Sequence, residues 1–191
     1  MSRLHFDTYY LIHLSRLEAT EADVIVATLL ASGAGYLLIR LLMAKGPRGL
    51  LSSVDFRSSP AQLGIAVLVG ICATFVVRLI LTGRLTGLRI QEPRPGVLFA
   101  LLLLGGVAMQ PFVEEVYFRG ILFAGLSDKL GPWVSICFVT LAFALLHGGH
   151  WRVVLPISIG LGIIRVLTGS TANSFAMHAA YNLGVMLWGI R

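Results

Sequence analysis

The sequence predicts an all-α fold, a polytopic transmembrane bundle of about six helices. Hydrophobic residues make up 57% of the 191 residues, the mean hydropathy is +0.85, and only 13% of the residues are charged. Soluble domains are about 45–50% apolar and about 25% charged. The apolar runs are also long and unbroken, whereas barrel strands alternate apolar and polar residues. Because backbone polar groups in a bilayer must be satisfied within the segment, such runs are expected to be helices.

The charge of the chain indicates which partners to expect, and its two cysteines indicate whether to expect a disulfide or a metal site. The net charge is +6 and the isoelectric point is about 9.9, but the basic residues mostly flank apolar runs, where they anchor helices to anionic headgroups. We therefore expect a lipid bilayer as a partner, and no nucleic acid. Cys72 and Cys137 lie inside apolar runs and are predicted to be small buried hydrophobes, not a disulfide or a metal pair.

The order of polar and apolar stretches predicts three regions. Residues 1–23 mix charged and aromatic residues without a continuous apolar run, which is typical of an interfacial or flexible lead. Residues 24–82 are predicted to form two accessory transmembrane helices, and a basic, proline-containing connector follows them. Residues 97–191 form the third region, with four further helices. The six expected spans are about 24–43, 61–81, 97–126, 132–147, 153–167 and 172–190.

Details within these spans lead to further expectations. The third span is longer than one crossing needs, so it is expected to tilt or to break near Gln110 and Pro111, since proline removes a backbone donor. Residues 127–131 are predicted to form a tight turn. Arg78 and Arg165 lie near the ends of their spans and are predicted to extend toward the headgroups.

Six crossings place both termini on one side of the membrane. Lysine and arginine are modestly more frequent in the loops on that side, which predicts a cytoplasmic N-terminus. We expect an integral protein of a prokaryotic inner or plasma membrane.

The third span carries ionisable residues inside an apolar helix. A charge at bilayer depth costs at least about 2.5–3.5 kcal/mol on insertion scales, so such residues usually face a cavity and have a function. Each helical residue advances by about 100°, so Glu114 and Glu115 point to different faces. Glu115 and Arg119 are four residues apart in the favoured order. This spacing predicts that Arg119 neutralises Glu115 and that Glu114 faces a pocket.

Two later spans contain a histidine that is paired with another residue at the same four-residue spacing. Phe143 and His147 share one face of the fourth span, and His178 and Asn182 share one face of the sixth. A carboxylate and a histidine in a low-dielectric pocket can hold a water molecule and accept its proton. A second histidine and an asparagine can donate hydrogen bonds to a developing oxyanion. These residue types predict hydrolysis of an amide without a covalent nucleophile.

Read together, these residues form three short motifs. Residues 114–119 read as EExxxR, residues 143–147 as FxxxH, and residues 178–182 as HxxxN. In this order, the motifs resemble the signature of the CAAX protease and bacteriocin-processing family, also called the Abi family, of glutamate-type intramembrane endopeptidases. The resemblance covers about half of the chain, residues 97–191, which it identifies as an intramembrane protease core.

The resemblance implies a role for each motif residue. Glu114 and His147 would activate a water molecule, and His178 and Asn182 would stabilise the oxyanion. Glu115, paired with Arg119, would support the site. The expected partner is a membrane-associated protein or peptide substrate, cleaved in a CAAX-type, sorting-signal or bacteriocin-type maturation, and no cofactor is expected.

Other interpretations remain open at this stage. Two glutamates and two histidines can bind a divalent metal, although the sequence has no HExxH-like cluster. Glutamate and histidine chains also relay protons in transporters, but no inverted repeat is evident. The same residues would also fit a non-catalytic immunity or interaction protein, as a buried ion-pair network with polar contacts between helices.

Overall fold

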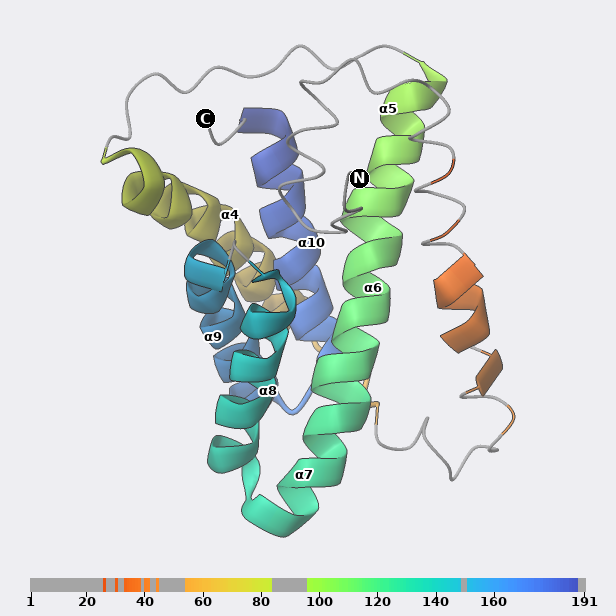
Figure 1. Ribbon diagram of the computed structural model, residues 1–191, viewed down its shortest axis with the longest axis vertical. Helices are drawn as coiled ribbons and strands as arrows, with labels where there is room; N and C mark the ends of the chain where they lie inside the picture. The colour runs from red at the N-terminus through yellow and green to blue at the C-terminus, as the bar shows by residue number, and fades with distance from the viewer. Residues whose placement is uncertain are drawn as a thin grey trace.

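The structure is a computed structural model, and every regular element in its described residues is helical (Figure 1). The predicted all-α class is therefore confirmed for this part of the chain. The predicted lead at 1–23, most of the first span and the interior of the connector lie outside the described residues. The described residues are 26, 30, 33–38, 40, 41, 44, 54–83, 96–148 and 151–188.

From residue 97 onward, the helices follow one another with short connections. The elements are α4 (Pro60–Thr82), α5 (Val97–Leu102), the π-helical η1 (Leu103–Met109), α6 (Gln110–Glu115), the π-helical η2 (Val116–Leu122), α7 (Phe123–Leu130), α8 (Pro132–Leu146), α9 (Trp151–Thr168) and α10 (Thr171–Trp188).

Three helices in the described residues are long and apolar enough to cross a membrane, Pro60–Ile80, Phe99–Leu130 and Trp151–Thr168, and they indicate an integral membrane protein. The apolar helix α8 is shorter, with 15 residues. Large apolar side chains lie exposed on the outer faces of the bundle, as expected for surfaces that contact lipid. Examples are Ile65, Leu68 and Ile80 on α4, Phe138, Leu141 and Leu145 on α8, and Ile159, Ile163 and Leu167 on α9.

Local sequence signals explain where α4 begins and ends. The Ser59 side chain accepts a hydrogen bond from the backbone N–H of Gln62, and the Gln62 side chain accepts one from the Ser59 N–H. This reciprocal cap satisfies two backbone donors, and Pro60 occupies the first turn, where no N–H is needed. Gly83 ends the helix with a φ of 65° and donates to the Leu79 carbonyl over 2.8 Å.

The elements from α5 to α7 are successive stretches of one helix, shown in green in Figure 1. The part of this helix that is apolar enough to cross a membrane has 32 residues and is about 48 Å long. The hydrocarbon core of a bilayer is about 30 Å thick. The helix is not broken at Pro111. Because proline lacks an N–H, the regular bonding pattern is interrupted there, and the wider π-helical turns of η1 precede it.

Two other expectations about loop and side-chain placement were wrong. Residues 127–131 were expected to be a turn, but α7 continues to Leu130 and only Gly131, with a φ of 75°, turns the chain. Cys72 and Cys137 are exposed, not buried. Their position in an apolar run does not determine which face of the helix they occupy.

Arg78 and Arg165 are buried, with 8% and 7% of their surfaces exposed, so the expected extension toward the headgroups was also wrong. The Arg165 Nε donates to the Arg119 carbonyl over 2.9 Å. Its guanidinium lies over the Phe123 ring, 4.8 Å from the ring centroid. Arg165 therefore connects α9 to the long helix.

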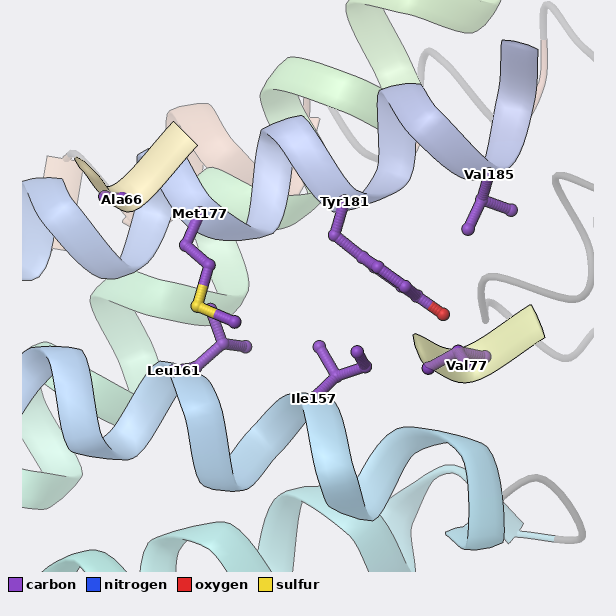
Figure 2. Close-up of a cluster of buried hydrophobic side chains, with 7 residues drawn as sticks. All are labelled: Ala66, Val77, Ile157, Leu161, Met177, Tyr181 and Val185. Atoms are coloured by element: carbon purple, nitrogen blue, oxygen red, sulfur yellow. The ribbon is translucent and has the colours of Figure 1, made fainter. Parts of the chain in front are cut away.

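Helix α10 lies at the centre of the bundle and packs against α4, α9 and the long helix (Figure 1). Figure 2 shows the apolar cluster that joins it to α4 and α9, with Met177 facing Leu161. The cluster contains Ala66, Val77, Ile157, Leu161, Met177, Tyr181 and Val185. This packing holds the polar face of α10 against the long helix.

Glycines let α4 and α10 approach each other closely. A methyl group placed at Gly70 would overlap the carbonyl oxygen of Met177, and one placed at Gly184 would overlap the hydroxyl of Thr74. The Thr74 hydroxyl lies 3.3 Å from the Gly70 carbonyl on its own helix and 3.4 Å from the Tyr181 carbonyl on α10, and it can donate to either one.

This close contact predicts opposite effects for two alanine substitutions on α4. Gly70→Ala should destabilise the protein by about 1–3 kcal/mol, because the opposing backbone cannot move aside like a side chain. Gly64→Ala adds its methyl group to open space and should stabilise the helix by about 0.5–1 kcal/mol. Thermal unfolding of both variants in one detergent measures the difference. Equal melting temperatures for the two variants would contradict a close contact between α4 and α10 at Gly70.

Candidate active site

A fully buried ion pair lies at the centre of the polar residues. The Arg119 Nη1 is 3.1 Å from the Glu115 Oε1, and neither side chain is exposed. Both residues lie on the long helix, four positions apart, so the structure contains the predicted contact. The pairing removes the cost of leaving either charge alone in an apolar interior.

Arg119 also joins the long helix to its neighbours. Its Nη2 donates to the Ser158 hydroxyl over 2.7 Å and approaches the Ser158 carbonyl at 3.3 Å. The guanidinium lies 4.3 Å from the centroid of the Phe143 ring. Sequence reasoning missed Ser158, because a lone serine in an apolar span gives no signal of its partner.

His178 lies between the two glutamates. Its Nδ1 is 2.9 Å from the Glu115 Oε1, and its Nε2 is 3.8 Å from the Glu114 Oε2. A carboxylate accepts hydrogen bonds, so Nδ1 carries the proton in this contact and Nε2 is directed to Glu114. The resemblance assigned His178 to the oxyanion, and the structure shows in addition that it binds the supporting carboxylate.

The two glutamates have different environments, as their spacing predicted. The Glu114 side chain is 19% exposed, whereas that of Glu115 is fully buried. The Glu114 Oε1 accepts a hydrogen bond of 3.0 Å from the Gln110 side chain. Gln110 was considered only for a possible helix break, although its four-residue spacing from Glu114 on α6 was a usable signal.

His147 ends α8 and is held by its own helix. Its Nδ1 lies 2.6 Å from the Phe143 carbonyl, which can only accept, so Nδ1 is the donor and Nε2 has the free lone pair. The Phe143 ring centroid is 4.5 Å from that of His147 and 6.0 Å from that of His178. Among the described residues no ion pair joins His147 to Glu114, and their convergence on one water molecule stays a prediction.

Asn182 is buried on the face of α10 that carries His178. Its Nδ2 donates to the Gly106 carbonyl over 2.9 Å, and its Oδ1 is buried without a partner in the described part of the chain. The Gly106 carbonyl belongs to the π-helical η1. The contact therefore uses one of the two amide N–H groups that the resemblance assigned to the oxyanion.

Within the described ranges, no group of three or more histidine, cysteine, aspartate or glutamate side chains is arranged to bind a metal ion.

The buried pair predicts an unequal response to two arginine substitutions. Arg119→Met should destabilise the protein by about 3–5 kcal/mol, because it leaves the Glu115 charge buried without its cation. The double variant Glu115→Gln/Arg119→Met should regain part of this loss. Arg152→Met is the control, since Arg152 is exposed and such changes usually stay within about 0.5 kcal/mol. Similar melting temperatures for both single variants would argue against the pair.

Comparison with known families gives one match. Residues 95–184 match the family model described as "Type II CAAX prenyl endopeptidase Rce1-like". The match covers just under half of the 191 residues and contains all six residues assigned to the site. Comparison with curated proteins and with solved structures gave no match. Residues 95–184 are therefore similar to the Rce1-like type II CAAX prenyl endopeptidase family.

Proposed function

We propose that this protein is an intramembrane endopeptidase that hydrolyses a peptide bond of a membrane-associated protein or peptide. The observation that carries this proposal is the partly exposed Glu114 beside His178, within the stretch that matches the model of a peptidase family. A carboxylate next to an imidazole in an apolar bundle is suited to taking a proton from water.

A single water molecule beside Glu114 and His178 would bond to both side chains. At 3.8 Å, the Glu114 Oε2 and the His178 Nε2 are too far apart for a direct hydrogen bond, and a bridging water can bond to both. We assign this water as the nucleophile and Glu114 as its base. His147 would help to hold the water through Nε2, because the bond to Phe143 keeps the proton on Nδ1.

The proposed reaction follows from these assignments. The water oxygen bonds to the peptide carbonyl carbon as its proton moves to Glu114, and the carbonyl oxygen becomes an oxyanion. The second N–H of the Asn182 amide stabilises that charge, and His178, which the resemblance also assigns to the oxyanion, keeps its Nε2 toward the reacting groups. The proton on Glu114 then passes to the amide nitrogen as the C–N bond breaks, which releases an amine and a carboxyl group.

Glu115 and Arg119 support this chemistry from within the bundle. Glu115 holds the His178 Nδ1, so that Nε2 faces Glu114. Arg119 keeps Glu115 in place and balances its charge. An orienting carboxylate behind a histidine fixes both its proton position and its ring angle.

We propose the remaining features of the protein as follows. The chain crosses a prokaryotic inner or plasma membrane six times and has a cytoplasmic N-terminus. Two accessory helices come first in the chain, and residues 97–191 then form the protease core. The description of the matching family favours a CAAX-type substrate over sorting-signal or bacteriocin-type maturation, so a prenylated peptide is the first probe.

The proposal predicts that Glu114→Gln abolishes cleavage. The probe is a quenched fluorescent peptide that ends in a farnesylated CAAX sequence, added to purified protein in liposomes. The rate should fall about 10²–10⁴-fold, since the amide cannot act as a base. Asp128→Asn is the matched control, because Asp128 is exposed on the same long helix, and it should cleave like the wild type.

A second measurement covers substrates that lack a prenyl group. New protein N-termini in membranes of the expression host should appear with the wild type and not with Glu114→Gln. Full retention of cleavage by Glu114→Gln, or no cleavage by the wild type in both assays, would overturn the peptidase proposal and favour an immunity protein or a transporter.

A further inference from the structure

We infer that Gln110 is a positioning residue that selects which oxygen of Glu114 reacts. This inference rests on the proposed function. The Gln110 Nε2 donates to the Glu114 Oε1 over 3.0 Å. The other oxygen, Oε2, is the one that lies 3.8 Å from the His178 Nε2. The two contacts divide the carboxylate into a held oxygen and a reacting oxygen.

The backbone around Gln110 makes it a fixed point for this contact. The Gln110 N–H bonds to the Gly105 carbonyl, which completes the last π-helical turn of η1. Pro111 follows directly and restricts its own backbone to one narrow range of φ. Gln110 is half-buried, and it lies one helical turn before Glu114 on α6. Its side chain therefore starts from a constrained position and reaches the carboxylate along the helix face.

An amide is chemically suited to this role. Its N–H forms a charge-assisted hydrogen bond with a carboxylate, but it carries no charge and transfers no proton. A lysine or arginine at this position would form an ion pair with Glu114. The pairing would neutralise the carboxylate and make it a weaker base. The amide instead holds Oε1 while Glu114 keeps its charge and Oε2 stays directed to the water and His178.

Two substitutions of nearly equal size separate this role from simple packing. Gln110→Met removes the donor and should lower kcat for the farnesylated probe about 10–100-fold, with KM within about two-fold, because the base is misplaced and substrate binding is not. Gln110→Glu replaces the donor with an acceptor and should lower kcat further. Gln62→Met is the matched control, since Gln62 makes its hydrogen bonds at the cap of α4. It should lose stability and keep the wild-type kcat.

A double-mutant cycle tests whether Gln110 acts through Glu114. In the Glu114→Gln background, Gln110→Met should change the residual cleavage less than about two-fold, because the group that it positions is already gone. An equal loss of kcat in both backgrounds, or a wild-type kcat in Gln110→Met, would overturn the inference about Gln110. Cleavage by the wild type would still support the peptidase proposal in either case. Absence of cleavage by the wild type would overturn the peptidase proposal itself.

Discussion

The ion pair between Glu115 and Arg119 is the interaction on which the described polar contacts depend. Both side chains are fully buried, and an unpaired charge there would be very costly. Other helices add contacts to the pair, with His178 on α10 bonding to Glu115 and Ser158 on α9 bonding to Arg119. The Glu115 Oε2 and the Arg119 Nε are buried without a partner in the described part of the chain. The pair therefore joins the long helix to its two neighbours, and it determines how they are aligned.

The same pair explains the difference between two adjacent glutamates. Glu115 is committed to Arg119 and His178, so its charge is shared and its position is fixed. Glu114 points to another side of the helix and remains partly exposed, and its hydrogen-bond donor among the described residues, Gln110, is uncharged. A network that holds one carboxylate through its Oε1 leaves the next carboxylate available for chemistry. In this way an ion pair can support a hydrolytic site without taking part in the reaction.

The wrong placements of two arginines and two cysteines share one physical cause. Arg78 and Arg165 were placed at the membrane surface, and Cys72 and Cys137 in the interior, from their positions along apolar spans. Hydropathy along a span gives the depth of a residue, but the direction of its side chain depends on which helices lie beside it. The guanidinium of Arg165 is buried because Phe123 and the Arg119 carbonyl meet it there.

The sequence by itself determined the all-helical class, the spacing of the three motifs and the contact between Glu115 and Arg119. These features are local, since helical geometry sets which residues four positions apart share a face. Only the tertiary structure decided that Ser158 meets Arg119, His178 meets Glu115 and Asn182 meets Gly106, contacts that span 39, 63 and 76 positions. No periodicity within one helix can specify them, because they arise from how α9 and α10 pack against the long helix, and that packing depends on many weak apolar contacts and on close approaches such as that at Gly70.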